Sequence, residues 1–184
     1  MPPVFALGAF SALAACTVDS PRKYGVAAVA VLFGAVIPFI YLLALLRKKK
    51  VTGIDVPVRL QRTEPYLVCV SIYLVGFLIL YLLRASLPVS ALMFCYAANT
   101  FVVSLINMQW KISAHAMGAS GPLTLLAMTF GWKVLPLFSL VPLVAWARVE
   151  LKVHTRGQVV AGALLGVIMT AAQLQGFYEF AGGR

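Results

Sequence analysis

Two short segments of this 184-residue chain hold its only two histidines, each close to basic residues. In the segment WKISAHAMG, Lys111 precedes His115, and in ARVELKVHTRGQ, Arg148 and Gln158 flank His154. An imidazole can act as a nucleophile or as a general acid. Arginine and lysine side chains bind phosphate oxygens. The two segments therefore predict phosphoryl transfer through a histidine, with cations that hold the phosphoryl group.

The carboxylates of the chain are few and scattered, with only five aspartates and glutamates in all. Phosphoryl chemistry that depends on a divalent metal generally uses carboxylate oxygens as ligands. The three cysteines lie in apolar runs and form no CxxC or Cys/His pattern, so neither a zinc site nor a disulfide framework is indicated; they are Cys16, Cys69 and Cys95. We expect a metal-independent reaction that needs no organic cofactor.

The composition is typical of an integral membrane protein, with 62% hydrophobic and 11% charged residues. Soluble domains carry about 25% charged residues. The net charge of +10 comes from basic residues that lie between apolar runs. This distribution favours membrane lipids and a lipid phosphate substrate as partners, rather than nucleic acid.

Six apolar segments are suited to crossing a bilayer as helices, which takes about 20 residues each. They are Tyr24–Leu46, Pro65–Leu83, Val89–Asn107, Ala116–Phe130, Val134–Ala147 and Gly157–Phe177. The last one contains GALLG, a spacing of glycines that permits close helix packing. We expect an all-α polytopic membrane helix bundle with six core transmembrane helices, in which residues 1–184 form a single domain.

A seventh apolar segment, residues 3–18, lies near the start of the chain. It lacks the basic beginning and the cleavage site of a signal peptide. We interpret it as an additional short N-terminal membrane helix and leave open whether it crosses the bilayer.

The number of spans between the polar stretches decides which side of the membrane they share. Two predicted spans separate the basic stretch 47–64 from the stretch around His115, and two more separate that stretch from residues 148–156. All three stretches therefore emerge on the same side of the membrane. We expect Lys111, Ser113 and His115 to face Arg148 and His154 there, together with the arginines at positions 59 and 62.

Three segments resemble the motifs of the type 2 phosphatidic acid phosphatase superfamily. ISAH (Ile112–His115) resembles the second motif, usually Pro-Ser-Gly-His, and ARVELKVHTRGQ (Ala147–Gln158) resembles the third, in which arginine and histidine have the same spacing. DVPVRLQRTEP (Asp55–Pro65) loosely resembles the first motif, a basic stretch that ends in Arg-Pro. The resemblance covers about residues 24–177.

The resemblance implies that His154 attacks phosphorus and forms a phosphohistidine, while His115 protonates the leaving group. It also implies a set of ligands for the phosphoryl oxygens, comprising Arg148, Lys111, Arg62, Ser113 and, in competition with Arg62, Arg59. We favour Arg62 over Arg59 for this role. Asp55 either orients an arginine or is solvated in its loop, and we favour solvation.

The sequence departs from the family pattern at several positions. Ile112 and Ala114 replace proline and glycine of the second motif, and Ala147 replaces the serine of the third. Gln158 stands where the family has an aspartate beside the nucleophilic histidine. Its amide oxygen can accept the Nδ1–H of His154, but a neutral amide stabilises an imidazolium less than a carboxylate does.

These features predict a membrane lipid phosphatase that acts on a lipid phosphate or diphosphate of the phosphatidic acid, phosphatidylglycerol phosphate or polyprenyl phosphate type. The alternative is a non-catalytic protein that binds or transports a lipid phosphate at a degenerate site. A prenyltransferase is excluded because the chain lacks paired aspartate-rich motifs. The oligomeric state is left open.

The distribution of basic residues indicates the orientation of the site. Ten basic residues lie on its side of the predicted bundle and five on the other, or seven against five without Arg62, Lys111 and Arg148. Cytoplasmic loops are enriched in lysine and arginine, so the count favours a site that faces the cytoplasm.

Overall fold

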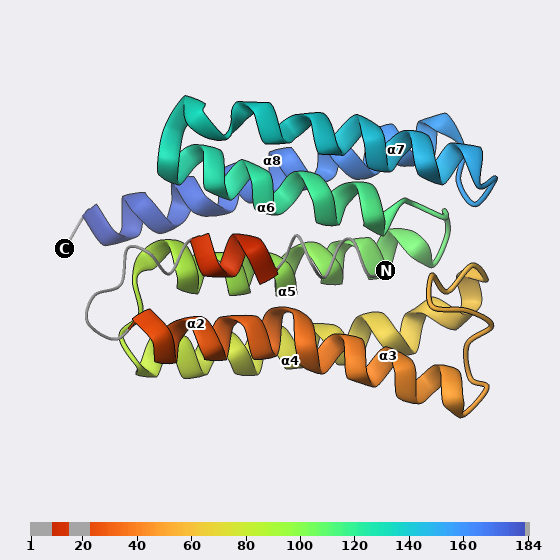
Figure 1. Ribbon diagram of the computed structural model, residues 1–184, viewed down its shortest axis with the longest axis horizontal. Helices are drawn as coiled ribbons and strands as arrows, with labels where there is room; N and C mark the ends of the chain where they lie inside the picture. Colours follow the sequence, from red (N-terminus) through yellow and green to blue (C-terminus); the bar gives the residue numbers. More distant parts are fainter. Residues whose placement is uncertain (1–8, 15–22, 183–184) are drawn as a thin grey trace.

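The protein is a bundle of long helices (Figure 1), seen in a computed structural model that describes residues 9–14 and 23–182. Every element in this part of the chain is helical, and none is a strand. The all-α membrane helix bundle expected from the sequence is thereby confirmed. Residues 9–14 of the predicted N-terminal helix are helical, and the rest of that segment lies outside the described residues.

The first crossing rod is built from three helical pieces in one line, α2 (Lys23–Val31), the π-helical turn η1 (Leu32–Val36) and α3 (Ile37–Arg47). The π-helical turn lies directly before Pro38. Because proline has no N–H to donate, it interrupts the regular hydrogen-bond ladder at this point. A loop then leads to the short 3-10 helix η2 (Arg59–Arg62) and to the return helix α4 (Thr63–Leu82).

The central helix of the bundle is α5 (Leu87–Asn107). In its most apolar stretch of 18 residues, 56% is buried, whereas 22% to 33% is buried in the corresponding stretches of the other crossing segments. Helices α4, α6 and α8 all pack against it. The remaining helices are α6 (Ala114–Phe130), η3 (Gly131–Ser139), α7 (Leu140–Glu150) and α8 (Arg156–Gly182).

Five continuous helical segments are long and apolar enough to cross a membrane, and one of them, Ala114–Glu150, has 37 residues. This segment reverses at Gly131, whose φ of 74° is a conformation that glycine adopts readily. Its two arms, α6 and α7, run side by side in opposite directions (Figure 1). The described residues therefore contain six helical arms suited to crossing a membrane, as expected.

The predicted helix Val134–Ala147 does not form as one α-helix. Residues Gly131–Ser139 form a 3-10 helix, and α7 begins only at Leu140. Pro136 lies inside the 3-10 segment and cannot donate an α-helical hydrogen bond. At about 2.0 Å per 3-10 residue and about 1.5 Å per α-helical residue, the two pieces together still span the ~30 Å hydrocarbon core.

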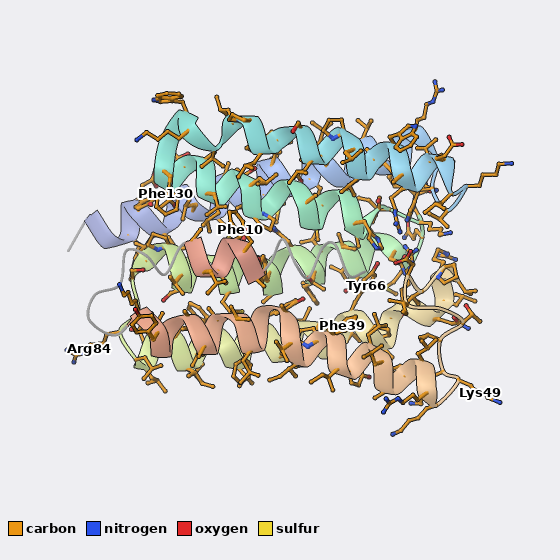
Figure 2. The ribbon with its side chains drawn as sticks, in the orientation of Figure 1. Phe10, Phe39, Lys49, Tyr66, Arg84 and Phe130 are labelled. Atoms are coloured by element: carbon orange, nitrogen blue, oxygen red, sulfur yellow. The ribbon has the colours of Figure 1, made fainter. Side chains whose placement is uncertain are left out.

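The connections α3–η2, α5–α6 and α7–α8 all lie at one end of the bundle, on the right in Figure 1. Nitrogen and oxygen atoms of the side chains gather at this end in Figure 2. Lys49 lies at this end, and Arg84 marks the opposite one. The three polar stretches thus share one end of the bundle, which we call the site end.

Helices α6 and α8 approach each other closely through the glycines of the GALLG segment. A Cβ atom at Gly162 would collide with the backbone carbonyl of Ser113. A Cβ atom at Gly166 would lie 2.8 Å from the carbonyl oxygen of Met117. Small residues allow backbones to pack at this distance inside a membrane. The close approach brings the beginning of α6 against α8 at the site end.

Candidate active site

The beginning of α6 is fixed by Ser113, which caps the helix. Its hydroxyl accepts a hydrogen bond from the N–H of Ala116 at 3.3 Å, which is the usual role of an N-cap serine. Its own N–H donates to the carbonyl of Gln158 in α8 at 3.2 Å. His115 therefore lies in the first turn of α6, where it is buried.

The beginning of α8 is a capping box formed by Thr155 and Gln158. The Thr155 hydroxyl accepts the Gln158 N–H at 3.3 Å, and the Gln158 Oε1 accepts the Thr155 N–H at 3.1 Å. This reciprocal pair satisfies two backbone donors at the helix start. It also identifies the side-chain atom of Gln158 as an oxygen, because a backbone N–H can only donate.

His154 precedes this capping box and shares its acceptor. The Nδ1 of His154 lies 3.1 Å from the Gln158 Oε1. Because that oxygen accepts, Nδ1 must carry the proton. A neutral imidazole has only one N–H, so the Nε2 of His154 carries a lone pair. This is the tautomer that a nucleophilic histidine requires.

The environment of His154 keeps its ring neutral. Burial, followed by the nearby positive charge of Arg62, lowers the pKa of His154 to about 4. The charges of Lys111 and His115 act in the same direction, while the hydrogen bond to Gln158 opposes them. The unprotonated ring therefore predominates at neutral pH. These effects also show that Arg62, Lys111 and His115 all lie near the His154 ring.

His115 has a different set of partners, centred on a carboxylate. Its Nε2 lies 3.3 Å from the Oδ1 of Asp55, and the Nη1 of Arg148 donates to the Oδ2 of Asp55 at 2.8 Å. Hydrogen bonding from His115 lowers the pKa of Asp55 well below its usual range, so the carboxylate is ionised. An ionised carboxylate only accepts, which places a proton on the Nε2 of His115.

Arg148 lies in the last turn of α7 and faces both histidines. Its Nη1 is 3.5 Å from the Nε2 of His115. Its backbone carbonyl accepts the N–H of His154 at 3.3 Å, which folds the α7–α8 connection back on itself. The Nε of Arg148 is buried and has no hydrogen-bond partner among the described residues. One donor of this guanidinium is therefore available to an anion.

Arg62 and Lys111 complete the positive side of the site. Arg62 is only 4% exposed, and it donates from Nε to the Val56 carbonyl at 2.8 Å and from Nη1 to the Ile112 carbonyl at 3.4 Å. Burial, followed by the charge of Arg62, lowers the pKa of Lys111. Both cations lie at the site end, beside His154.

Arg59 is not part of this group. Its Nη1 donates to the backbone carbonyls of Asn107 and Met108, and the Asn107 side chain donates to the Arg59 carbonyl at 3.2 Å. Arg59 thus ties the loop before α4 to the end of α5. A role in holding phosphate oxygens does not fit this arrangement.

Asp55 is the site residue that the sequence prediction placed wrongly. Solvation in the loop was favoured, but its carboxylate bonds Arg148 and contacts His115. Its position in the motif-like segment Asp55–Pro65, as an acid in a basic stretch, was the one available signal. The pairing depends on one loop and two helix ends that meet only in the folded bundle.

A metal site is not apparent in the part of the chain that the structure describes. No group of three histidine, cysteine, aspartate or glutamate residues lies close enough together to hold a metal ion there. The charged groups that face the histidines are mostly cations, and these suit an anion.

Comparisons with known proteins give no match. The sequence matches no protein-family model, no curated protein and no solved structure. The interpretation of the site therefore depends on the residues of this chain and on their geometry.

Proposed function

We propose that this protein is a membrane lipid phosphatase that works through a phosphohistidine intermediate. The observation that carries the proposal is that the Nε2 atoms of two neighbouring histidines differ, one having a lone pair and the other a proton. His154 has a lone pair on Nε2, fixed by Gln158, and His115 has a proton on Nε2, fixed by Asp55. One ring is prepared to attack phosphorus and the other to donate a proton.

In the first half of the reaction, the Nε2 lone pair of His154 forms a bond to phosphorus as the bond from phosphorus to the leaving oxygen breaks. His115 acts in its imidazolium form: it gives its Nε2 proton to the leaving alkoxide, which becomes an alcohol, and it remains as a neutral ring that keeps its Nδ1 proton. Negative charge spreads over the three remaining phosphoryl oxygens in this transition state. Arg148, Arg62 and Lys111 stabilise that charge.

In the second half, a water molecule attacks the phosphorus of the phosphohistidine. His115, now unprotonated on Nε2, accepts a proton from this water. The phosphorus–nitrogen bond breaks, its electrons return to the Nε2 of His154, and inorganic phosphate leaves. Both histidines then have their starting protonation, so the cycle consumes only water and the phosphate ester.

The unpartnered donor of Arg148 supports an anionic ligand. A buried donor without a partner costs free energy, and such groups in folded proteins are generally hydrogen-bonded. The Nε of Arg148 is such a donor. A phosphoryl oxygen beside Arg148 would accept this N–H and would lie next to the Nε2–H of His115.

A cavity next to the site supports a lipid rather than a soluble phosphate as substrate. Its lining includes Val56, Arg62 and Ala114 at the site end, and it follows α5 from Val103 to Leu92. The eleven residue-to-residue steps from Leu92 to Val103 correspond to about 16 Å of helix, the length of a substantial hydrocarbon chain. Most of the lining is apolar, so the cavity can accept the tail of a lipid whose headgroup reaches Arg62.

Polar groups deeper in this cavity are bonded to one another. Asn99 donates to the Thr170 hydroxyl at 2.9 Å, and Gln173 donates to the Asn99 Oδ1 at 3.0 Å. They hold α5 against α8. Because both ends of the Asn99 amide are bonded, this part of the cavity wall favours a hydrocarbon over a polar chain.

The resemblance to the type 2 phosphatidic acid phosphatase superfamily leads to the same reaction class. Phosphatidic acid, phosphatidylglycerol phosphate and polyprenyl phosphates or diphosphates are the candidate substrates. The chemistry uses histidines and cations and requires no metal. The excess of basic residues at the site end favours a site that faces the cytoplasm.

The test is phosphate release by the purified protein from a panel of these lipids in detergent micelles, with EDTA present. We expect turnover of at least one of them and none of a soluble sugar phosphate. The acid-labile, base-stable phosphoryl group of a phosphohistidine should be trapped at His154 by rapid quenching. Absence of turnover with every lipid phosphate would contradict the proposal.

The second candidate function is non-catalytic binding or transport of a lipid phosphate. It is favoured by the neutral amide of Gln158 and by the loss of the motif serine at Ala147, since both weaken the catalytic pattern. Binding alone requires the cations but not two histidines whose Nε2 atoms differ in protonation. Vanadate distinguishes the candidates, because it imitates five-coordinate phosphorus and would bind tightly only to a site with a nucleophilic His154.

A further inference from the structure

The loop that carries Asp55 is held firmly on both sides of this residue. Val51 and Val56 are 3% and 1% exposed and pack with Leu42 and Leu45 of α3. The Val56 N–H donates to the Gly53 carbonyl at 2.9 Å, and the Val56 carbonyl accepts the buried Arg62 Nε. The carboxylate is therefore presented by an anchored turn rather than by a solvated loop.

The backbone directly after Asp55 is strained. Val56 has a φ of 43°, in the left-handed region that β-branched residues strongly avoid. Such a conformation persists only where the surroundings impose it, and it often occurs at functional sites. Here the buried Val56 side chain and the Arg62 hydrogen bond impose it, and Asp55 is aimed at the site as a result.

The two oxygens of Asp55 have separate partners. Oδ2 accepts from Arg148 at 2.8 Å, and Oδ1 lies 3.3 Å from the Nε2 of His115. The charged or titratable groups that face His115 from the described elements are Asp55, Arg148 of α7, and His154 before α8. The charges of Arg62 and Lys111 act on the His154 ring. Asp55 is the negative charge in this set.

We propose that Asp55 is a positioning residue that holds Arg148 in the site and retains the proton on His115. This inference rests on the proposed function. Asp55 provides for the acid histidine the carboxylate partner that residue 158 does not provide for the nucleophilic histidine. The leaving oxygen of the substrate would approach the Nε2–H of His115, the group that also donates to Asp55. The carboxylate would keep the proton on this nitrogen until the proton is transferred.

The first experiment measures protonation without catalysis. The chain contains only two histidines, so protein labelled in histidine, with any affinity tag removed, shows two imidazole signals in NMR. His115→Ala and His154→Ala assign them. In Asp55→Asn, we expect the titration midpoint of His115 to fall by about one pH unit, a tenfold loss of proton affinity, because an opposite charge in contact is removed. His154 should titrate almost as before.

The matched control is Glu64→Gln, which removes the carboxylate nearest to Asp55 in the sequence. Glu64 bonds Lys50 at 2.9 Å and Tyr41 at 3.1 Å, outside the site. This variant should leave the His115 midpoint unchanged. Asp55→Glu keeps the charge on a longer side chain, so it should lower the midpoint less than Asp55→Asn does, and it provides the measurement if the neutral variant is unstable.

The second experiment follows turnover of an alkyl phosphate against pH. A general acid must be protonated, so Asp55→Asn should move the loss of activity at high pH downward by the same unit. A purely structural effect would lower the rate at every pH, and the pH at which activity is lost on the basic side of the profile (the basic limb) would not change.

The outcomes separate the two proposals. Wild-type protein that releases no phosphate contradicts the proposed function, whatever the NMR titration shows. Active wild-type protein in which Asp55→Asn moves neither the His115 midpoint nor the basic limb overturns the role of Asp55 alone. A common shift of both histidines would also overturn it, because a general change of electrostatics would then be sufficient.

Discussion

His154 and His115 lie at the same end of the bundle, yet their partners differ in charge. His154 bonds the neutral amide of Gln158, and His115 faces the carboxylate of Asp55 and the cation of Arg148. The amide fixes a tautomer without adding charge, so the ring stays a neutral nucleophile. The carboxylate of Asp55 holds a proton on the Nε2 of His115. The comparison shows that two buried imidazoles can be given opposite tasks by the acceptor that each one faces.

The largest expected effect is the loss of the nucleophile. His154→Ala should lower turnover by about 1,000-fold or more, because it removes the proposed nucleophile of the covalent step. Rapid quenching should show no phosphorylated protein, and vanadate should no longer bind tightly. Turnover that survives this substitution would show that the two histidines have been assigned the wrong way round.

The second largest expected effect is the loss of the proposed general acid, His115. His115→Ala should slow hydrolysis of an alkyl lipid phosphate by about 100-fold, within the range of general acid catalysis. An aryl phosphate such as p-nitrophenyl phosphate, whose leaving group needs no proton, should lose much less. Kinetics with both substrates at one pH makes this comparison. Equal losses would mean that His115 does not donate the proton.

A carboxylate in place of Gln158 should make the hydrogen-bond partner of His154 more like that of His115. In Gln158→Glu, a carboxylate replaces the amide at nearly the same shape and can still accept from Thr155. The added charge should raise the pKa of His154 from about 4 by about one unit, since a nearby anion favours the imidazolium. The unprotonated ring is the active one, so the loss of activity at low pH should begin about one unit higher. An unchanged acid limb would mean that Gln158 does not govern the protonation of His154.

The smallest effect concerns Lys111, the more exposed of the phosphate-binding candidates. Lys111→Gln should weaken vanadate binding by at most about fivefold, because exposed ion pairs contribute only about 0.2–1 kcal/mol. It should also raise the pKa of His154 slightly, because the Lys111 charge helps to lower it. Lys152→Gln, an exposed lysine in the α7–α8 connection, is the matched control and should change neither quantity.

Local spacing allowed much of the site to be predicted from the sequence. Gln158 follows His154 by four residues, and the capping box at the start of α8 brings its amide oxygen to the ring, so this contact is nearly independent of the rest of the fold. The number of spans brought His115 to the same end as His154. The fold class followed from the length of the apolar segments, and the 3-10 start of the fifth arm was missed because Pro136 alone does not indicate which helix type will form.

The positions of Asp55 and Arg59 could not be predicted from the spacing of residues in the sequence. Both lie in the loop before α4, where neither helical nor strand periodicity applies. Asp55 reaches the site through the unusual backbone of Val56, and Arg59 turns to carbonyls at the end of α5. These positions are decided by packing between segments about 50 or more residues apart in the chain, which the order of residues alone does not express.

The close approach of Gly162 to Ser113 has a consequence for how the protein matures. His115 enters the bundle with α6, but the connection that bears His154 is secured only when α8 docks against it. During synthesis, Arg62, Lys111 and His115 are therefore in the membrane before His154 is in place. Under the proposed function, a partly inserted chain would attract lipid headgroups without hydrolysing them, and activity would report that the last helix has been assembled.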